Sequence, residues 1–458
     1  MRDLRHLGLW YATLLHPIEP RAPLERDARA DVAIVGAGYT GLWTAYYLTR
    51  LEPGIRVAIV EAEFAGFGAS GRNGGWCLGS MAGLDSLAAD PAHREGALRL
   101  QRALFDAVDE VGRVCAREAI ECHYAKGGWI SVASVAAQRE RLRADLAGWH
   151  AQGLTEEDAR WLEPAECAAR VRTPRNLGGL FFAHCAALHP ARLARGLALA
   201  VERRGVVIHE RSPALAIEGR SVVTRRARLR ADTVVRATEG FSGSLRGEAR
   251  RLVPMHSMMV ATEPLSEDVW KEIGLERREA FSDARRIVVY GQRTADGRLA
   301  FGSRGRYLFG SAVPERFADD SRDYARVERI LASFFPTLRG CRIEHRWSGP
   351  VAVPRGWRPS VGLDRATGLA WAGGYVGEGV AASNLAGRTL AELILGRESE
   401  RTSLPLVGAP FPLWEPEPLR WLGVQGVLRL GQWLDASELA GRRPSRLAGA
   451  VFRRFVRA

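Results

Sequence analysis

Lysine is nearly absent from this sequence of 458 residues, because Lys126 and Lys271 are the only two lysines among 65 basic residues. The net charge of +13 therefore comes from arginines, which are scattered along the chain. Nucleic-acid-binding segments instead gather Lys and Arg on one face or in one run, where they displace counterions from phosphates. With no such run and no recognised module, we expect no nucleic-acid partner.

Cysteine patterns and long apolar runs are also missing. The six cysteines form no CxxC pair and no metal-finger spacing, so we expect reduced thiols, a cytoplasmic protein and no bound metal. No window of eighteen apolar residues occurs, which excludes a membrane-spanning helix. The early run LGLWYATLL is followed by HPIEPRAPLERD, which is too long, charged and proline-rich for a cleavage region. We expect residues 1–30 to remain as an N-terminal extension.

The strongest pattern lies in DVAIVGAGYTGLWTAYYLTRLEPGIRVAIVEAE, which begins at Asp31. The segment begins with an apolar run, which is followed by the GxGxxG glycines Gly36, Gly38 and Gly41. A helical stretch and a second apolar run come next, and Glu61 ends the second apolar run. The glycines allow a tight turn, close approach of the main chain to a pyrophosphate, and packing of helix on strand. An acid at Glu61 suits ribose hydroxyls and disfavours a 2′-phosphate. This strand, helix and strand predict a site for FAD or NAD.

The stretch GFGASGRNGGW, residues 66–76, identifies the cofactor more narrowly. With its ASGRNGG segment the chain resembles the D-amino-acid-oxidase-like flavoenzymes, which include glycine and sarcosine oxidases and the γ-glutamylputrescine oxidoreductases, from about residue 31 to 396. The resemblance implies that this loop passes along the pyrophosphate and the flavin ring, where glycine leaves room for a flat ring. The expected cofactor is FAD, held non-covalently because RWSGPVAV lacks the flavin-linking cysteine of the sarcosine oxidase branch.

Three later segments complete the cofactor site that the resemblance implies. They are a strand at 206–209 whose main chain faces the adenine, a second dinucleotide contact in RADTVVRATEG, and a glycine-rich turn at 373–379. The helix after that turn points its N-terminus at the pyrimidine edge of the flavin, where a helix dipole stabilises the anionic reduced form. The candidate cofactor-binding residues are Gly36, Gly38, Gly41, Glu61, Ser70, Gly71, Arg72, Asn73, Gly74, Gly75, Val207, Thr238, Gly240, Gly374, Tyr375, Gly377, Gly379 and Val380.

Cofactor segments spread over this length require a domain that is discontinuous in sequence. We predict an α+β (α/β) protein with a glutathione-reductase-type, Rossmann-like FAD-binding domain and a second domain whose antiparallel sheet carries the substrate site. The first comprises 31–100, 171–240 and 346–396, and the second 101–170 and 241–345. Residues 397–458 form a helical, basic C-terminal extension. Its last helix, PSRLAGAVFRRFVRA, either docks on its own protein or lies on an anionic membrane.

The resemblance also implies an activity, that of an FAD-dependent amine or amino acid oxidase or dehydrogenase. A hydride passes from the carbon beside an amine nitrogen to flavin N5, the imine is hydrolysed, and the electrons go to O2 or another acceptor. Ala300 and Ala381 replace the oxygen-activating and carboxylate-binding lysines of sarcosine oxidase relatives, which leaves acceptor and substrate open. The alternatives are a peripheral membrane dehydrogenase that reduces quinone and a redox-responsive flavin-binding protein without turnover.

Several side chains are candidates for contact with a small amine or amino-acid-like substrate. Arg358 matches a position where several family members place an arginine near the substrate, and its guanidinium suits a carboxylate or an amide. Arg304 and Tyr307 are expected to line the same cavity. Weaker candidates are Trp129, His256 and Tyr375.

Overall fold

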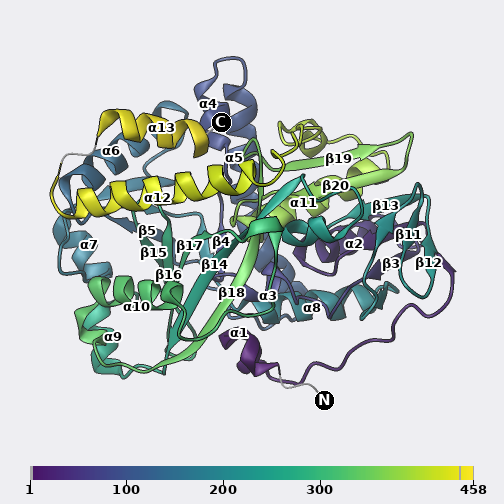
Figure 1. Ribbon diagram of the computed structural model, residues 1–458, viewed down its shortest axis with the longest axis horizontal. Coiled ribbons are helices and arrows are strands. Elements are labelled where there is room, and N and C mark those ends of the chain that lie inside the picture. Colours follow the sequence, from purple (N-terminus) through teal and green to yellow (C-terminus); the bar gives the residue numbers. More distant parts are fainter. Residues whose placement is uncertain (1–3, 443–444, 457–458) are drawn as a thin grey trace.

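The computed structural model describes residues 4–442 and 445–456. One half of the molecule, on the right of Figure 1, is built on a six-stranded sheet in the order β19-β20-β13-β2-β3-β9. All neighbours are parallel except β19 and β20. Its central strands are apolar and fully buried, as a parallel sheet covered on both faces requires. The strands are β2 (Val32–Val35), β3 (Val57–Val60), β9 (Val207–His209), β13 (Thr233–Arg236), β19 (Ser360–Asp364) and β20 (Leu369–Gly373).

Four helices share one apolar core with this sheet. Close packing between two of them depends on Gly387, because a Cβ there would stand 2.6 Å from the Cβ of Trp43. Two chain segments more than 300 residues apart therefore lie in contact. The helices are α2 (Tyr39–Leu51), α5 (Arg94–Arg117), α8 (Pro190–Glu202) and α11 (Gly379–Ile394).

The other half is an eight-stranded sheet in the order β18-β14-β17-β16-β15-β5-β7-β6. It is antiparallel except where β15 pairs with β5. Its core gathers Phe281, Phe301, Phe334 and Phe335, and α10 (Arg322–Phe334) turns its apolar face onto them. The strands are β5 (Trp129–Val132), β6 (Ala159–Leu162), β7 (Gly179–Phe182), β14 (Leu252–Thr262), β15 (Ala280–Asp283), β16 (Val289–Arg293), β17 (Leu299–Arg306) and β18 (Ile343–Pro354).

Smaller elements connect and flank the two halves. A four-stranded sheet of β1 (Ala28–Arg29), β12 (Arg228–Arg230), β11 (Ser221–Val223) and β10 (Ala216–Ile217) lies beside the larger parallel sheet, and β4 (Trp76–Leu78) pairs with β8 (Cys185–Ala187). The remaining α-helices before the C-terminal extension are α1 (Leu9–Ala12), α3 (Ala69–Arg72), α4 (Leu84–Ala89), α6 (Ala136–Ala151), α7 (Pro164–Arg170) and α9 (Glu267–Ile273). The 3-10 turns are η1 (Arg5–Leu7), η2 (Glu239–Ser244), η3 (Phe309–Ser311), η4 (Pro336–Leu338) and η5 (Glu400–Ser403).

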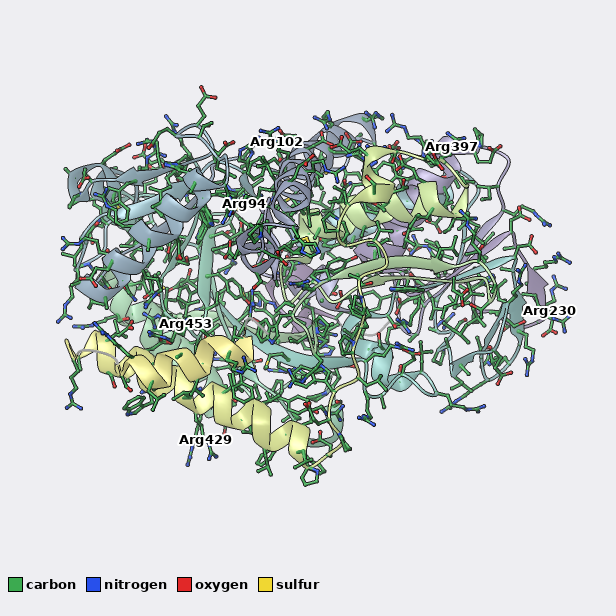
Figure 2. All side chains as sticks on the ribbon, turned by 90° about the horizontal axis from the view of Figure 1, so that it is seen from above. Arg94, Arg102, Arg230, Arg397, Arg429 and Arg453 are labelled. Carbon is green, nitrogen blue, oxygen red and sulfur yellow. The ribbon has the colours of Figure 1, made fainter. Side chains whose placement is uncertain are left out.

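The C-terminal extension contains α12 (Leu419–Leu439) and α13 (Arg446–Val456), which cross the eight-stranded half (Figure 1). The two helices pack where a Cβ on Gly431 would stand 2.7 Å from the ring of Phe452. Figure 2 shows them side by side, with Arg429 projecting away from the body. No helix in the described ranges is long and apolar enough to cross a membrane. Residues 443, 444, 457 and 458 of the expected extension, and residues 1–3, lie outside the described part.

This architecture confirms the predicted fold class, with a Rossmann-like parallel sheet, a second, largely antiparallel sheet and a helical extension. Three elements lie away from the half that the expected segments gave them. One is β18, most of which falls in 346–396 although it pairs with β14 in the eight-stranded sheet. Helix α5 packs into the core of the parallel sheet, because its long amphipathic face matches that of α11. Strand β7 pairs with β5 and β6 in the other sheet. The remaining segment boundaries stay a prediction.

Candidate flavin and substrate site

The glycine turn between β2 and α2 requires its glycines. Gly36 has φ of +105°, and a Cβ there would stand 2.7 Å from the carbonyl oxygen of Ala237. A Cβ on Gly41 would stand 2.0 Å from the oxygen of Gly36. Gly38 is the N-cap of α2, and a Cβ on it would lie 3.0 Å from Ser70 Oγ. The first turn of α2 thus faces the 66–76 loop with bare main chain, an arrangement that suits phosphates.

Glu61 lies at the carboxyl end of β3, beside this turn. Its Oε2 accepts a hydrogen bond of 2.8 Å from the N–H of Ala37, and its Oε1 one of 3.1 Å from the N–H of Glu63. Burial raises the pKa of this carboxyl to about 7. The position is the one from which an acid reaches ribose hydroxyls in dinucleotide folds.

The polar side chains of the 66–76 loop bind the protein's own groups. Ser70 Oγ accepts from the N–H of Tyr39 at 2.8 Å, and Asn73 Oδ1 accepts from the N–H of Gly75 at 2.8 Å. Arg72 is buried and donates to the carbonyl oxygens of Phe67 and Glu315, both at 2.9 Å. The Nη2 of Arg72 is buried without a partner among the described residues. These residues, predicted as handles on the cofactor, hold the loop in shape, and the Nη2 of Arg72 is left as a donor to spare.

The glycines of this loop contact the eight-stranded sheet. A Cβ on Gly74 would stand 2.4 Å from the ring of Tyr290, and one on Gly75, whose φ is +73°, would stand 2.0 Å from Gln292 Nε2. Gln292 donates to the carbonyl oxygen of Gly74 at 2.6 Å. Tyr290 and Gln292 both lie on β16, which sequence reasoning took only as a strand. The loop is therefore held between the two sheets.

The N-terminal extension covers the same loop from the other side. Trp10 Nε1 donates to the carbonyl oxygen of Asn73 at 2.8 Å, and the Tyr11 hydroxyl donates to that of Gly66 at 2.7 Å. Gly71 has no room for a side chain, because a Cβ would stand 2.3 Å from the Tyr11 hydroxyl. Helix α1 is thus part of the site, which the sequence did not indicate.

The second dinucleotide contact predicted at the end of β13 lies next to the first glycine turn. The Cα of Thr238 is 3.7 Å from the position of a Cβ on Gly36, and Thr238 Oγ1 bonds Ser242 Oγ at 2.8 Å. Gly240 approaches Pro350, whose Cβ would be 3.0 Å from a Cβ on the glycine. Both residues therefore lie at the carboxyl edge of the parallel sheet.

Val207 lies elsewhere on that sheet. It pairs with Ala58 in the middle of β3, and its side chain is 52% exposed at the sheet edge. The residues next to Glu61 are instead His209 and Ser212. The carbonyl oxygen of His209 accepts from the N–H of Glu61 at 2.8 Å, and the N–H of Ser212 donates to the carbonyl oxygen of Glu61 at 2.8 Å. Residues 209–212, and not Val207, therefore lie beside Glu61, and the expected contact of the Val207 main chain with the adenine stays a prediction.

A half-buried carboxylate, that of Glu239, supports the last glycine turn. Glu239 Oε1 accepts from the N–H groups of Gly374 at 2.8 Å and of Tyr375 at 3.3 Å, and burial raises its pKa to about 7. The hydroxyl of Tyr375 bonds Thr40 Oγ1 at 3.0 Å, which ties this turn to α2. Sequence reasoning missed Glu239, whose only signal is an acid three residues after the end of a buried strand. Gly379 and the buried Val380 open α11 as expected.

Between the 66–76 loop and the eight-stranded sheet lies a cavity of about 340 Å³. Three aromatic side chains wall it: Trp76 packs edge-on against Tyr290 at 5.8 Å between ring centroids and lies 6.1 Å from Trp129. The Tyr290 hydroxyl and Ser257 Oγ are hydrogen-bonded. Arg72, Asn73, Gly74, Gly377 and Val380 from the predicted cofactor segments also line it. This cavity, termed here the reaction cavity, brings both halves of the molecule together.

An ion pair joins β17 to the start of α11 at the reaction cavity. Arg304 on β17 lies 3.9 Å from Glu378, the residue before α11, and both line the cavity. Burial raises the pKa of Glu378, although Arg304 acts against the shift. Gly377, whose φ is +92°, lies against the same guanidinium. A Cβ on Gly377 would stand 3.1 Å from Arg304 Cζ. Glu378 was missed in the sequence, where GYVGEGV was read for its glycines.

Among the other candidate substrate residues, Arg358, Tyr307 and His256 do not line the reaction cavity. Arg358 is exposed, with its Cγ 2.8 Å from the position of a Cβ on Gly83. Tyr307 is buried and donates to Glu417 Oε1 at 2.6 Å, so it anchors the start of α12. His256 bonds the carbonyl oxygen of Ala312 at 3.1 Å. Trp129, given low weight from the sequence, is a wall residue.

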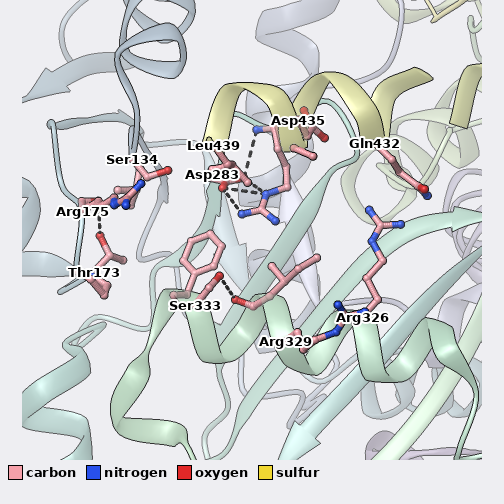
Figure 3. Close-up of a pocket in the computed structure, with 16 residues that line it drawn as sticks. Ser134, Thr173, Arg175, Asp283, Arg326, Arg329, Ser333, Gln432, Asp435 and Leu439 are labelled. Atoms are coloured by element: carbon pink, nitrogen blue, oxygen red, sulfur yellow. Dashed lines mark hydrogen bonds and ion pairs between the residues drawn. The ribbon is translucent and has the colours of Figure 1, made fainter. Parts of the chain in front are cut away.

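A separate cavity of about 480 Å³ lies between α10 and α12. Figure 3 shows Arg326 rising from α10 toward α12, and Asp283, in the same cavity, pairs with Arg285. Asp283 and Arg285 also line the reaction cavity. None of the predicted cofactor residues lines this cavity, so it is not the cofactor site.

The residues of the two glycine turns and the 66–76 loop fit a flavin dinucleotide. Bare main chain and the N-termini of α2 and α11 suit its pyrophosphate and ring, Glu61 suits its ribose, and the reaction cavity is walled by aromatic side chains. Within the described ranges no group of three His, Cys, Asp or Glu side chains is placed to hold a metal ion.

Comparison with known proteins agrees with this fit. The model of the FAD dependent oxidoreductase family, DAO, matches residues 31–393. γ-Glutamylputrescine oxidoreductase of Escherichia coli (strain K12) is 30% identical over 417 residues, 89% of this chain and 93% of that protein. The probable oxidoreductase OrdL of Rhizobium meliloti (strain 1021) is 31% identical over 417 residues, 88% and 92% of the two chains.

Among solved structures, glycine oxidase from Geobacillus kaustophilus matches with a TM-score of 0.70 at 20% identity, covering 85% of this chain and 99% of that one. The family match includes the glycine turn after β2, the 66–76 loop and the glycine turn before α11. The resemblance first drawn from ASGRNGG is confirmed: the chain belongs to the FAD dependent oxidoreductase (DAO) family, and it is an enzyme whose cofactor is FAD.

Proposed function

We propose that this enzyme oxidises the C–N bond of an amine or amino-acid derivative in the reaction cavity. The observation that carries the proposal is the Arg304–Glu378 pair, at 3.9 Å, in a cavity bordered by the predicted flavin loop and an aromatic wall. When bound, FAD accepts the hydride that leaves the carbon beside the nitrogen. Water then adds to the imine and releases a carbonyl compound and an amine or ammonia.

The side chains of the cavity have separate roles in this proposal. Arg304 binds the carboxylate or carbonyl oxygen of the substrate, for which a guanidinium is well shaped. The Glu378 carboxylate takes a proton from the substrate ammonium, because only the neutral amine has the lone pair that assists hydride loss. A carboxyl whose pKa is raised by burial is a stronger base than an ordinary carboxylate, which suits that transfer. Trp76, Trp129 and Tyr290 exclude water and position the substrate carbon.

The names of similar proteins support the substrate class. One relative is named for γ-glutamylputrescine, and a structural neighbour for glycine. The test is anaerobic mixing of the purified yellow protein with amines, N-methyl amino acids and polyamine conjugates. We expect at least one class to bleach the flavin absorbance and to yield a carbonyl product. Binding without bleaching by every class would instead indicate a flavin-binding protein without turnover.

The electron acceptor is a separate part of the proposal. Neither lysine lies near the reaction cavity, because Lys126 pairs with Asp109 and Lys271 with Asp268 at the surface. Ala300 and Ala381 are buried in apolar cores. We propose O2 as the acceptor in a cytoplasmic protein, with its six cysteines unpaired. Peroxide formation that matches amine consumption tests this.

A membrane quinone is the second candidate acceptor, on a different observation. Helix α13 exposes Leu447, Val451 and Phe455, with Arg453 and Arg454 also exposed on the same helix. Such a helix binds anionic lipid surfaces. Sedimentation with vesicles containing phosphatidylglycerol, together with faster reoxidation of reduced flavin by a soluble quinone than by air, would favour the quinone over O2.

A further inference from the structure

Behind the reaction cavity lies a second, larger cavity of about 440 Å³, termed here the apolar chamber. Its size is within the usual range of small-molecule pockets. One side is formed by the eight-stranded sheet and the 353–357 segment, and the other by α12 and α13. Its apolar lining includes Val253, Met255, Val353, Trp357, Val376, Trp414, Val424, Val427, Leu428 and Phe452.

The apolar chamber and the reaction cavity are neighbours that share part of their lining. Arg286, Val288, Arg304 and Glu378 border both. The Arg304–Glu378 pair, which is proposed to hold the polar end of the substrate, therefore stands at the junction. If the nitrogen of a substrate lies at this pair, one side of the nitrogen faces the reaction cavity and the flavin loop, and the other side faces the apolar chamber.

Most charged groups of the chamber are already paired, and Asp85, which also lines it, accepts a hydrogen bond of 3.4 Å from Trp149 Nε1. Arg355 bonds Glu415 at 3.0 Å, Arg420 bonds Glu417 at 3.1 Å, and Arg286 bonds Glu438 at 2.6 Å. A polar conjugate entering the chamber would find these groups engaged and would lose its own hydration. A hydrocarbon chain would lose no hydrogen bond, and each buried methylene strengthens binding about fourfold.

The outer wall of the chamber comes from this chain's own extension. The family match ends at residue 393, whereas α12 and α13 begin at Leu419 and Arg446. Substrate preference set by these helices can therefore differ from that of relatives matched over the family core.

We propose that the apolar chamber binds the non-reacting arm of the substrate and that this arm is an alkyl or arylalkyl group. The inference rests on the proposed function, because it takes the Arg304–Glu378 pair as the place of the amine. It predicts that long-chain or aryl-substituted amines are better substrates than polyamine conjugates such as the one for which the Escherichia coli relative is named.

Two glycines on α12 give a matched test. Gly423 lines the chamber and Gly426 does not, yet both are exposed and a Cβ on either would meet nothing within 4 Å. Gly423→Phe should fill the chamber, whereas Gly426→Phe places the same ring on the outer surface. Both variants replace a helical glycine, so their effects on the helix are alike.

The measurement is the second-order rate constant for anaerobic flavin reduction of the holoenzyme by n-alkylamines from ethyl to octyl. In the wild type it should rise about fourfold per methylene until the chamber is filled. Gly423→Phe should lower the octyl-to-ethyl ratio at least tenfold, and Gly426→Phe should leave the ratio unchanged. Titration calorimetry with N-alkylacetamides, whose nitrogen lone pair is delocalised, should show the same chain-length series without turnover.

Each other outcome overturns a distinct statement. If amines reduce the flavin equally at all chain lengths, or if the two variants behave alike, the chamber does not hold the arm. If Gly423→Phe slows only the reoxidation of reduced flavin by a soluble quinone, the chamber belongs to the acceptor and the inference is wrong. If no amine reduces the flavin while the acetamides still bind by chain length, the proposed function fails and the apolar chamber stands as a binding site.

Discussion

The carboxylate of Asp435, on α12, accepts a hydrogen bond of 2.8 Å from the main-chain N–H of Arg286, a residue that borders both cavities. A second bond of 2.9 Å comes from the N–H of Ile287. The C-terminal helix thereby fixes the loop between β15 and β16, which forms the wall between the cavities.

Replacing Asp435 by alanine should loosen this wall. Two main-chain donors lose their partner, which costs about 2 kcal/mol of unfolding free energy. We expect a lower melting temperature, measured by flavin fluorescence, and a higher KM for the amine in steady-state kinetics. Asp435→Asn keeps one acceptor oxygen and should lie between the wild type and Asp435→Ala. An alanine variant with unchanged KM would separate α12 from the reaction cavity.

Gly38 should be required for flavin retention. A Cβ there would lie 3.0 Å from Ser70 Oγ, and the further atoms of a valine side chain would enter the space in front of α2. We expect Gly38→Val to be purified with less than about a tenth of the wild-type flavin, since a main chain close to pyrophosphate tolerates no bulk. Gly54→Ala is the control, because its Cβ meets nothing within 4 Å. Full occupancy in Gly38→Val, read from the ratio of absorbance at 450 nm to protein, would contradict the pyrophosphate assignment.

Arg304 and Arg358 should behave differently although both were candidates from the sequence. Arg304→Gln removes the guanidinium at the cavity junction, and we expect KM for a carboxylate-bearing amine to rise about tenfold or more, as loss of a charge-assisted hydrogen bond implies. Arg358→Gln alters an exposed residue outside the cavity lining, so KM should change less than twofold. Steady-state kinetics with a neutral amine of equal size separates loss of the carboxylate contact from a general defect.

Stability should depend on pH through Glu239. Burial raises its pKa to about 7 from an ordinary value of 4.5. The folded protein therefore binds this proton more tightly than the unfolded chain, so the stabilisation is complete below pH 4.5 and is lost as the pH rises to 7. Glu239→Gln removes the dependence. The measurement is the unfolding free energy of the flavin-free protein in urea, for the variant and for the wild type. We expect the variant's value minus that of the wild type to increase by on the order of 2 kcal/mol between pH 5 and 7. Above pH 8 this difference should stay level. A constant difference would show that Glu239 is ionised throughout.

Local sequence patterns predicted much of the fold and several residues on the cofactor side of the site. The two VAIV strands around the GxGxxG turn are predicted well, because a buried parallel strand, a tight turn and an amphipathic helix each leave a signal within a few residues. The same holds for Glu61, whose place at the end of β3 follows from spacing alone.

The remaining site residues depend on contacts between distant segments. Gln292 reaches Gly74 across 218 positions, and Trp10 reaches Asn73 across 63, so no local pattern marks them. The place of Val207 opposite Ala58 could not be predicted, because alternation along a strand does not give its register with β3. The exposed position of Arg358, outside the lining of the reaction cavity, could not be predicted, because its residue type says nothing of the direction in which a loop presents it.

The strands of the parallel sheet come from distant parts of the chain, so the cofactor site is completed only late in synthesis. Strands β2 and β3 are synthesised first, yet β20, at Leu369–Gly373, and the turn before α11 are needed to finish the cofactor site. A nascent chain released from the ribosome before Gly379 has the first glycine turn but no complete place for the ring. Flavin capture is therefore a late event in biogenesis, and until then the exposed sheet depends on prompt completion of the chain or on chaperones.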